Sequence, residues 1–297
     1  MESEVIECYR KAGKISADIR NYIKSFVKKD MLLIDIAEKV ESKIIELGGD
    51  IAFPINLSVN EVAAHYTPSS SDKKTAQGIL KVDWGVEVEG YIADAAISLD
   101  LTEEKKFREM IELNDRALEN VLSRLKVSSV VKDIGNHVYE IVEENEEGYN
   151  IVKNLSGHSL EQYEIHAGLT ISNYPNTNLT SLKDEAFAIE PFLTKGKGEV
   201  YEGPLSEIYI LESDKQVRDR DARKLLDFIK DNYKTKPFCK RWLEKQNFPK
   251  LNFLLSLLVR EKVLHNFPVL IEMDKKPVSQ SEHTVIIHDK VEVITKG

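Results

Sequence analysis

Apolar residues recur at helical spacing in four stretches of the chain. They predict two helices before residue 50, over 4–28 and 31–47, and two more over 103–125 and 129–145. Thr102 is expected to cap the third helix, because its side chain can accept a hydrogen bond from the first turn. The stripe of the second helix consists of Leu33, Ile36, Ala37, Val40, Ile44 and Leu47.

Between the two helix pairs the chain has the pattern of a β-hairpin. Strand-forming residues flank Glu89 and Gly90, which suit a two-residue loop. This loop pairs each residue i with residue 179 − i, so Asp83 faces Ala96 and Asp94 lies diagonal to Asp83. Diagonal neighbours lie about 7–8 Å apart, within reach of a shared ligand. Two carboxylates aimed at one point repel each other unless a cation lies between them. The alternative is an exposed hairpin whose acids are solvated.

Short apolar runs typical of strands return after residue 150. They occur within 151–211 and again at 268–271 and 284–288. The Lys- and Arg-rich stretch 214–264 has a helical pattern, and we expect it to be an inserted helical subdomain. Helices followed by strands, twice over, indicate an α/β (α+β) fold with a two-fold repeat and a site between the halves. We expect residues 1–297 to form one catalytic domain around this insert.

The composition narrows the classes of function. The formal net charge is −9, whereas proteins that bind nucleic acid carry a basic surface, so we expect no nucleic-acid partner. No run of about 18 apolar residues predicts a membrane span. The first residues lack the basic and apolar regions of a signal peptide, and Cys8 and Cys239 show no pairing pattern. A cytoplasmic protein is therefore expected.

Several charged or imidazole side chains interrupt apolar segments. Glu190 stands inside an apolar run, and Glu282 comes just before the strand at 284–288. His158 follows a glycine, His166 comes eight residues later, and His65 precedes a turn. A lone histidine is more often a structural residue than a ligand. A carboxylate within an apolar strand costs several kcal/mol unless it is paired or bound to metal, so Glu190 is the clearest anomaly.

Together these positions form a set of four carboxylates and one imidazole. Such an oxygen-rich set suits two divalent first-row metals. A structural zinc site would use Cys and His ligands, and imidazole is a poor ligand for calcium. The members of the set are Asp83, Asp94, His158, Glu190 and Glu282.

The order of these motifs resembles the methionine aminopeptidases of the second type, in the short form without an N-terminal extension. The resemblance covers nearly the whole chain, and the insert between Glu190 and Glu282 marks the second type. The matching motifs are Asp83 and Asp94 spaced eleven apart, Gly157-His158, Ile165-His166-Ala167-Gly168, Ala188-Ile189-Glu190-Pro191-Phe192, and Glu282-His283-Thr284. The resemblance implies the pita-bread fold, a pseudo-two-fold antiparallel sheet backed by helices.

The same resemblance implies how a metal pair would be held. Asp94 and Glu282 would bridge two divalent metals, which Co, Mn, Fe or Zn could supply. Asp83 would hold one metal, while His158 and Glu190 would hold the other. Glu190 is also the implied proton carrier of a hydrolysis that removes N-terminal methionine from nascent chains with a small second residue.

A substrate site is implied as well. His65 and His166 would contact the substrate and the tetrahedral intermediate as further catalytic residues. The methionine pocket would include Phe53, Ile165, His166 and Phe267. An apolar pocket suits a thioether, because methionine gains from burial and its sulfur packs well on aromatic rings.

Two residues depart from the family pattern. Phe267 stands where some relatives have tyrosine. Trp84 is bulkier than the residue expected after Asp83, so its packing is a candidate for narrowing the site.

Two other functions have the same metal set or the same fold. Prolidase and aminopeptidase P enzymes carry a large N-terminal domain, whereas only about fifty residues precede the segment of His65 here. A non-catalytic binding protein of this fold is the second alternative. Nothing in the sequence requires more than a monomer.

The insert has a local excess of positive charge. Residues 224–245 carry seven basic and three acidic residues, a balance of +4 in a chain of net charge −9. We hypothesise that this stretch presents a basic surface outward for weak docking near the ribosome exit. A solvated helical face is the alternative. The basic residues are Lys224, Lys230, Lys234, Lys236, Lys240, Arg241 and Lys245.

Overall fold

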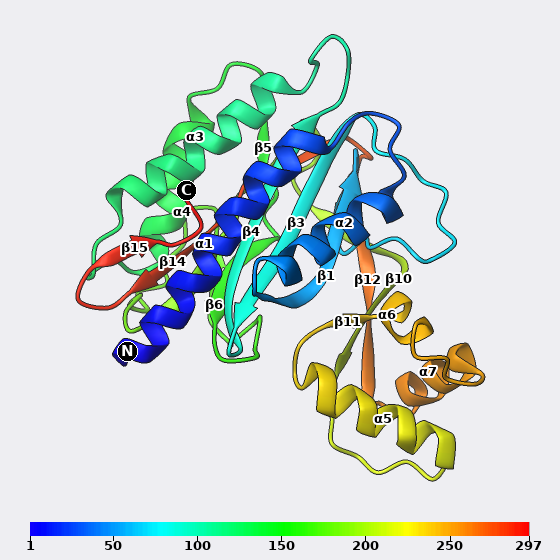
Figure 1. Cartoon of the computed structure of the whole chain (residues 1–297). Helices are drawn as coiled ribbons and strands as arrows, with labels where there is room; N and C mark the ends of the chain where they lie inside the picture. The colour runs from blue at the N-terminus through cyan, green and yellow to red at the C-terminus, as the bar shows by residue number, and fades with distance from the viewer. Residues whose placement is uncertain (297) are drawn as a thin grey trace.

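Two helices and a three-stranded sheet form the first half of the structure, a computed structural model that describes residues 1–296 (Figure 1). The strands are antiparallel, in the order β1-β3-β4. The elements are α1 (Ser3–Phe26), α2 (Leu33–Glu46), β1 (Asp50–Val59), β3 (Ile79–Val88) and β4 (Tyr91–Asp100). One apolar cluster joins both helices to the sheet, which explains the helical stripe in the sequence.

The second half repeats this plan with a five-stranded antiparallel sheet. Its order is β15-β14-β8-β6-β7, and a second apolar cluster packs two helices against it. The elements are α3 (Arg108–Arg124), α4 (Val131–Glu143), β6 (Ser156–Leu160), β7 (Thr170–Ser172), β8 (Glu185–Ile189), β14 (His283–Ile287) and β15 (Val291–Val293). The predicted α/β fold of antiparallel sheets backed by helix pairs is confirmed.

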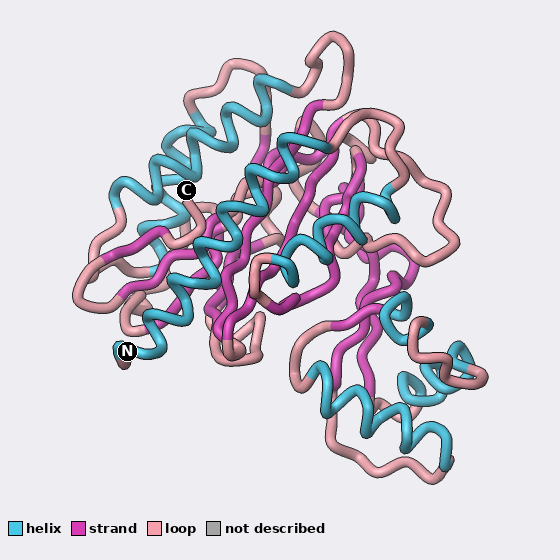
Figure 2. The backbone as a smooth tube through the Cα atoms, viewed as in Figure 1, coloured by secondary structure: helices cyan, strands magenta, loops and turns pink. Residues whose placement is uncertain are grey.

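Two smaller sheets complete the body. Their orders are β11-β10-β12-β2 and β13-β9-β5, again antiparallel. The strands are β2 (Val62–Ala64), β5 (Asn150–Ile151), β9 (Phe192–Thr194), β10 (Val200–Leu211), β11 (Phe238–Cys239), β12 (Leu264–Glu272) and β13 (Val278–Gln280). Strands β10 and β12 run out of the body toward a separate group of helices (Figure 2).

That group of helices falls within the stretch 214–264. It contains α5 (Arg220–Tyr233), α6 (Lys240–Glu244) and α7 (Leu251–Arg260), at the lower right of Figure 1, with α6 nearest the body. The three helices share an apolar cluster of their own. We therefore retain the inserted helical subdomain as a proposal and refer to α5–α7 below as the lobe.

The hairpin has the register expected from its loop. Asp83 pairs with Ala96, and Val88 pairs with Tyr91 across Glu89 and Gly90. The alternative of an exposed hairpin is wrong at Asp94, which is only 3% exposed.

Two local predictions are wrong. The third helix begins at Arg108 rather than at 103, and the residue at its N-cap position, Phe107, makes no side-chain cap. Thr102 instead closes the preceding turn, where its Oγ1 accepts the N–H of Lys106 at 3.0 Å.

Trp84 is fully buried on the helix side of the sheet, where its Nε1 donates to Ser16 Oγ at 2.9 Å. Successive strand residues point to opposite faces, so Trp84 points away from Asp83 and does not narrow the site.

The predicted outward basic surface is also wrong in part. Lys236 and Arg241 are buried, and they pair with Glu87 and Glu41 of the body. Burial of a charge costs free energy unless it is paired, and these acids provide the pairing. Part of the positive charge of the insert therefore binds the lobe to the body instead of facing solvent.

No helix within residues 1–296 combines the length and apolar character needed to cross a bilayer. Cys8 and Cys239 are both free thiols.

Candidate active site

The five predicted metal ligands converge on one cavity of about 240 Å³. Asp83 and Asp94 come from β3 and β4, on the face opposite the helices. His158 comes from β6, Glu190 follows β8 directly, and Glu282 precedes β14. The two halves of the fold thus contribute ligands to the same space, as the repeat of helices and strands suggested.

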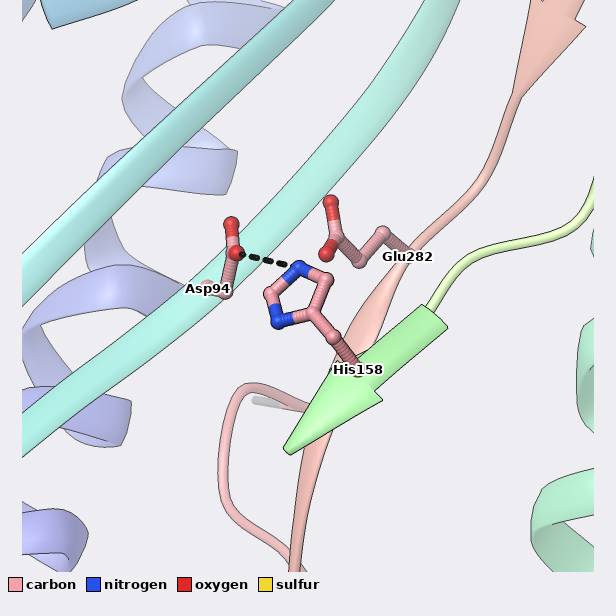
Figure 3. A group of neighbouring side chains, drawn as sticks. All are labelled: Asp94, His158 and Glu282. Carbon is pink, nitrogen blue, oxygen red and sulfur yellow. Dashed lines mark ion pairs between the residues drawn. The ribbon is translucent and has the colours of Figure 1, made fainter. Parts of the chain in front are cut away.

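Asp94, His158 and Glu282 form the tightest group (Figure 3). One ligand atom from each lies within 4.8 Å of the others. His158 Nε2 lies 3.7 Å from Asp94 Oδ2 and 3.4 Å from Glu190 Oε1. These distances leave room for an ion between the side chains.

The protonation of His158 favours a cation at this point. Its Nδ1 lies 3.4 Å from the carbonyl oxygen of Ser159, and because a carbonyl only accepts, Nδ1 carries the proton. Burial lowers the pKa of His158 to about 4, so the ring is neutral near pH 7. The lone pair of Nε2 therefore faces carboxylate oxygens, an arrangement that a metal ion stabilises.

The carboxyl groups show the same requirement for positive charge. Burial, followed by the charge of Glu190, raises the pKa of Asp83 to about 8, and burial raises the pKa of Glu190 to about 8. Burial and the neighbouring acids hold the pKa values of Asp94 and Glu282 well above their usual range. The buried oxygens Asp83 Oδ1, Asp94 Oδ1 and Glu282 Oε1 have no hydrogen-bond donor among residues 1–296. The residues present therefore fit divalent cations.

Gln280 is a member of the site that the sequence reasoning missed. Its Nε2 lies 3.1 Å from Asp83 Oδ2 and 3.4 Å from Glu190 Oε2. The same nitrogen lies 3.5 Å from Glu282 Oε2. Its position two residues before Glu282 could have identified it. Residues two apart in an extended segment share a face, so both side chains point toward the same space.

The backbone of the ligand strands is tied together behind the site. Thr284 Oγ1 accepts the N–H of Asp94 and donates to the carbonyl of Asp94, each at 2.7 Å. The N–H of Glu282 donates to the carbonyl of Ala96 at 3.1 Å. Arg20 Nη2 donates to the carbonyl of Glu282 at 2.8 Å. These bonds fix the relative positions of the two central carboxylates.

His65 and His166 line the cavity outside the ligand group. His65 has a left-handed backbone with φ of 63°, and its Nδ1 lies 3.3 Å from the carbonyl of Pro268. That contact places the proton on Nδ1 and leaves Nε2 as a hydrogen-bond acceptor. Burial lowers the pKa of His65 to about 4. The ring of His166 packs edge-on against His158, with 4.3 Å between ring centres.

Apolar residues form the remaining wall of the cavity. Phe53, Ile165 and Phe267 line it, and the rings of Phe267 and His65 lie 5.3 Å apart. Pro237 and several other lining residues were not anticipated, because no spacing rule relates the connection after α5 to the hairpin. The unanticipated lining residues are Pro54, Asn56, Ala64, Asn154, Leu155, Ser156, Phe192, Ile208, Pro237 and Leu270.

Residues 7–221 match metallopeptidase family M24. A methionine aminopeptidase from Pyrococcus horikoshii is 42% identical over 292 residues, which cover 96% of this chain and 97% of that protein. Further relatives described in the same way are 36–40% identical.

Two solved structures share the fold. A thermophilic Arx1 superimposes with a TM-score of 0.84 at 16% identity, covering 99% of this chain and 91% of that one. A methionine aminopeptidase from Rickettsia prowazekii superimposes with a TM-score of 0.69 at 18% identity, covering 99% and 98%. Both similarities establish the pita-bread fold. The chemistry has to be inferred from the residues of the site.

Proposed function

Since this chain belongs to metallopeptidase family M24, we propose that it is a methionine aminopeptidase, as are the relatives that match it over nearly their whole length. It is a metal-dependent aminopeptidase hydrolase. The observation that carries the proposal is identity of up to 42% to methionine aminopeptidases across 96% of the chain. The substrate is a polypeptide with a free N-terminal methionine and a small second residue.

We propose that two divalent metals bind here. Asp94 and Glu282 would help to hold both, Asp83 would hold one of them, and His158 and Glu190 would hold the other. When bound, two such metals polarise the scissile carbonyl and lower the pKa of water. Co, Mn, Fe and Zn all suit this ligand set, and their availability decides among them.

Glu190 is proposed to move the proton of the reaction. Its raised pKa of about 8 shows that burial favours its protonated form, and metal binding offsets that effect. A buried carboxylate beside the proposed metal ligands is placed to accept a proton and later to donate it. Glu190 would take the proton from water and pass it to the leaving amine.

The two histidines take different roles in this proposal. Because Nδ1 of His65 is committed to Pro268, its Nε2 can accept a hydrogen bond from a substrate N–H. His166 lies beside His158 and makes no such hydrogen bond within residues 1–296, so it is the better donor to the oxyanion of the intermediate. Phe53, Ile165 and Phe267 would surround the methionine side chain.

The cavity has a size suited to one side chain. At about 240 Å³ it is smaller than the roughly 300–1,000 Å³ of pockets that hold drug-sized ligands. The first residue of a peptide fits such a space, with its side chain on the apolar wall and its scissile carbonyl beside the proposed metal ligands, while the following residues would lie outside it.

The test is cleavage of Met-Ala-Ser by metal-depleted protein to which each metal is added back. Release of methionine that depends on added metal is expected. Ala-Pro is the control substrate, because a prolidase-like enzyme would cleave it. The prolidase alternative is not favoured, since the full-length relatives are methionine aminopeptidases. Failure to bind metal would instead favour the non-catalytic binding protein.

We also propose that the protein acts as a cytoplasmic monomer on emerging chains. Weak docking at the ribosome would rest on the exposed Lys224 and Lys245 and the half-exposed Lys230. Changing these three residues to Glu should abolish co-sedimentation with ribosomes at low salt and leave tripeptide cleavage unchanged. Equal co-sedimentation of the variant and the wild type would contradict the docking.

A further inference from the structure

Residues 234–237 connect α5 to β11 and cross from the lobe to the body. We call this segment the strap. Pro237 lines the cavity of the active site, whereas its neighbour Lys236 lines an outer cleft of about 550 Å³. The strap is therefore the wall between these two spaces.

Lys236 ties the strap to the first sheet. Its ammonium group pairs with Glu87 near the tip of the hairpin, and both side chains are buried. The same Nζ donates to the carbonyl of Ile51 at 3.2 Å. The other oxygen of Glu87 accepts the N–H of Gly90, so the acid also holds the hairpin loop.

The two preceding residues tie the strap to the turn before His166. Thr235 Oγ1 donates to the carbonyl of Tyr163 at 2.6 Å. Lys234 Nζ lies 3.3 Å from the centre of the Tyr163 ring. The N–H of Tyr163 donates in turn to the carbonyl of Gly90 at 2.8 Å, which joins this turn to the hairpin.

Two contacts of the strap are close in sequence to residues that line the cavity. Ile51 precedes Phe53 by two residues, and Tyr163 precedes Ile165 by two. The strap thus holds three parts of the apolar wall, including its own Pro237, at fixed separations.

Stability alone does not explain a buried ion pair at this position. Apolar residues of similar volume often stabilise a fold as well as such a pair does, because both charges must be desolvated. The best attested use of buried polar pairs is to fix one arrangement among several. An ion pair with one geometry defines the gap between Phe53 and Pro237 more strictly than apolar packing would.

We propose that the strap sets the width of the pocket for the first side chain of the substrate, with Lys236 and Glu87 as its positioning residues. The proposal rests on the proposed function and adds the origin of its side-chain selectivity. Loosening the strap should admit branched side chains that the native wall excludes.

The test uses Lys236→Met, Glu87→Met and the double variant. The controls are Arg241→Met and Glu41→Met. That buried pair also joins the lobe to the body, with N–O distances of 2.7 and 2.8 Å. Neither residue lines the cavity of the active site. Cleavage of Met-Ala-Ser and Leu-Ala-Ser gives the ratio of kcat/KM values. Metal content and Tm are measured for every variant.

The strap variants should lower the Met-to-Leu ratio about tenfold, a typical value for discrimination by one methylene-sized difference. The change should lie mainly in a lower KM for Leu-Ala-Ser, with metal content unchanged. The double variant should recover Tm without recovering the ratio, since the apolar pair restores packing but not the fixed gap. The control variants should lower Tm and keep the ratio.

A strap that only stabilises the lobe would behave as the controls do, and an unchanged ratio in both single variants overturns the proposal. Absence of Met-Ala-Ser cleavage by the wild type would contradict the proposed function instead. In that case titration with L-methionine and L-leucine decides the matter. Equal ratios of the two Kd values in the wild type and in Lys236→Met would then overturn the role of the strap.

Discussion

In the metal-free protein, the free energy of unfolding should fall as the pH rises from 7 to 9. The folded-state pKa values of Asp83 and Glu190 are about 8. Those of unfolded Asp and Glu are about 4. In this range the folded metal-free protein therefore binds more protons than the unfolded chain, and its free energy of unfolding falls as pH rises through the folded-state pKa.

The size of the effect follows from the same values. Raising the pH from 7 to 9 across a pKa of about 8 removes about 1–2 kcal/mol for each carboxyl group. The two groups together account for about 3 kcal/mol. For a chain of this size, that corresponds to roughly 5 °C in Tm.

The assay is thermal unfolding of metal-depleted protein, compared with metal-depleted Asp83→Asn/Glu190→Gln. Buried Lys81 and the histidines, whose pKa values are lowered by burial, contribute with the opposite sign. They are present in both proteins, so the difference between the two pH profiles reports Asp83 and Glu190 together with the effect of their charges on Asp94 and Glu282. Parallel profiles would refute the assignment of raised pKa values. Added metal should abolish the difference by holding both groups ionised.

Three further results are expected from substitutions in the site. Glu190→Gln should keep the fold and lower turnover by roughly 10²–10⁴-fold, as loss of general acid–base catalysis does; near-normal turnover with metal bound would contradict its role as proton carrier. His65→Ala and His166→Ala should lower kcat much more than metal content, and loss of stoichiometric metal would make either residue a ligand. Gln280→Leu should weaken metal binding about 10–100-fold, as loss of a ligand-orienting hydrogen bond does; titration calorimetry checks this, and an unchanged affinity would show that Gln280 does not orient the carboxylates.

The parts of the site that the sequence predicted are those that depend on local geometry. The loop at Glu89 and Gly90 determined the register that places Asp83 and Asp94 on one face. Glu190 was identified because a carboxylate is anomalous within an apolar run. Each inference needed only the period of a strand or the cost of burying a charge.

What could not be predicted depends on contacts between distant segments. Gln280 reads as an ordinary polar residue until β13 brings it between Asp83 and Glu190. Lys236 reads as a solvated lysine until the lobe packs on the hairpin and buries it beside Glu87. Local patterns contain no information about such partners, so the direction of a charged side chain was the least predictable feature of the insert.

The bond between Asp94 and Thr284 has a consequence for how the protein folds. These residues lie 190 positions apart, and their pairing closes a loop that spans most of the molecule. The entropic cost of closing such a loop must be met before its contacts contribute to stability. We therefore expect the metal site to assemble only after both halves have folded and docked. Metal should consequently slow unfolding far more than it accelerates refolding. It would therefore raise the kinetic stability of the folded protein without contributing to the folding nucleus.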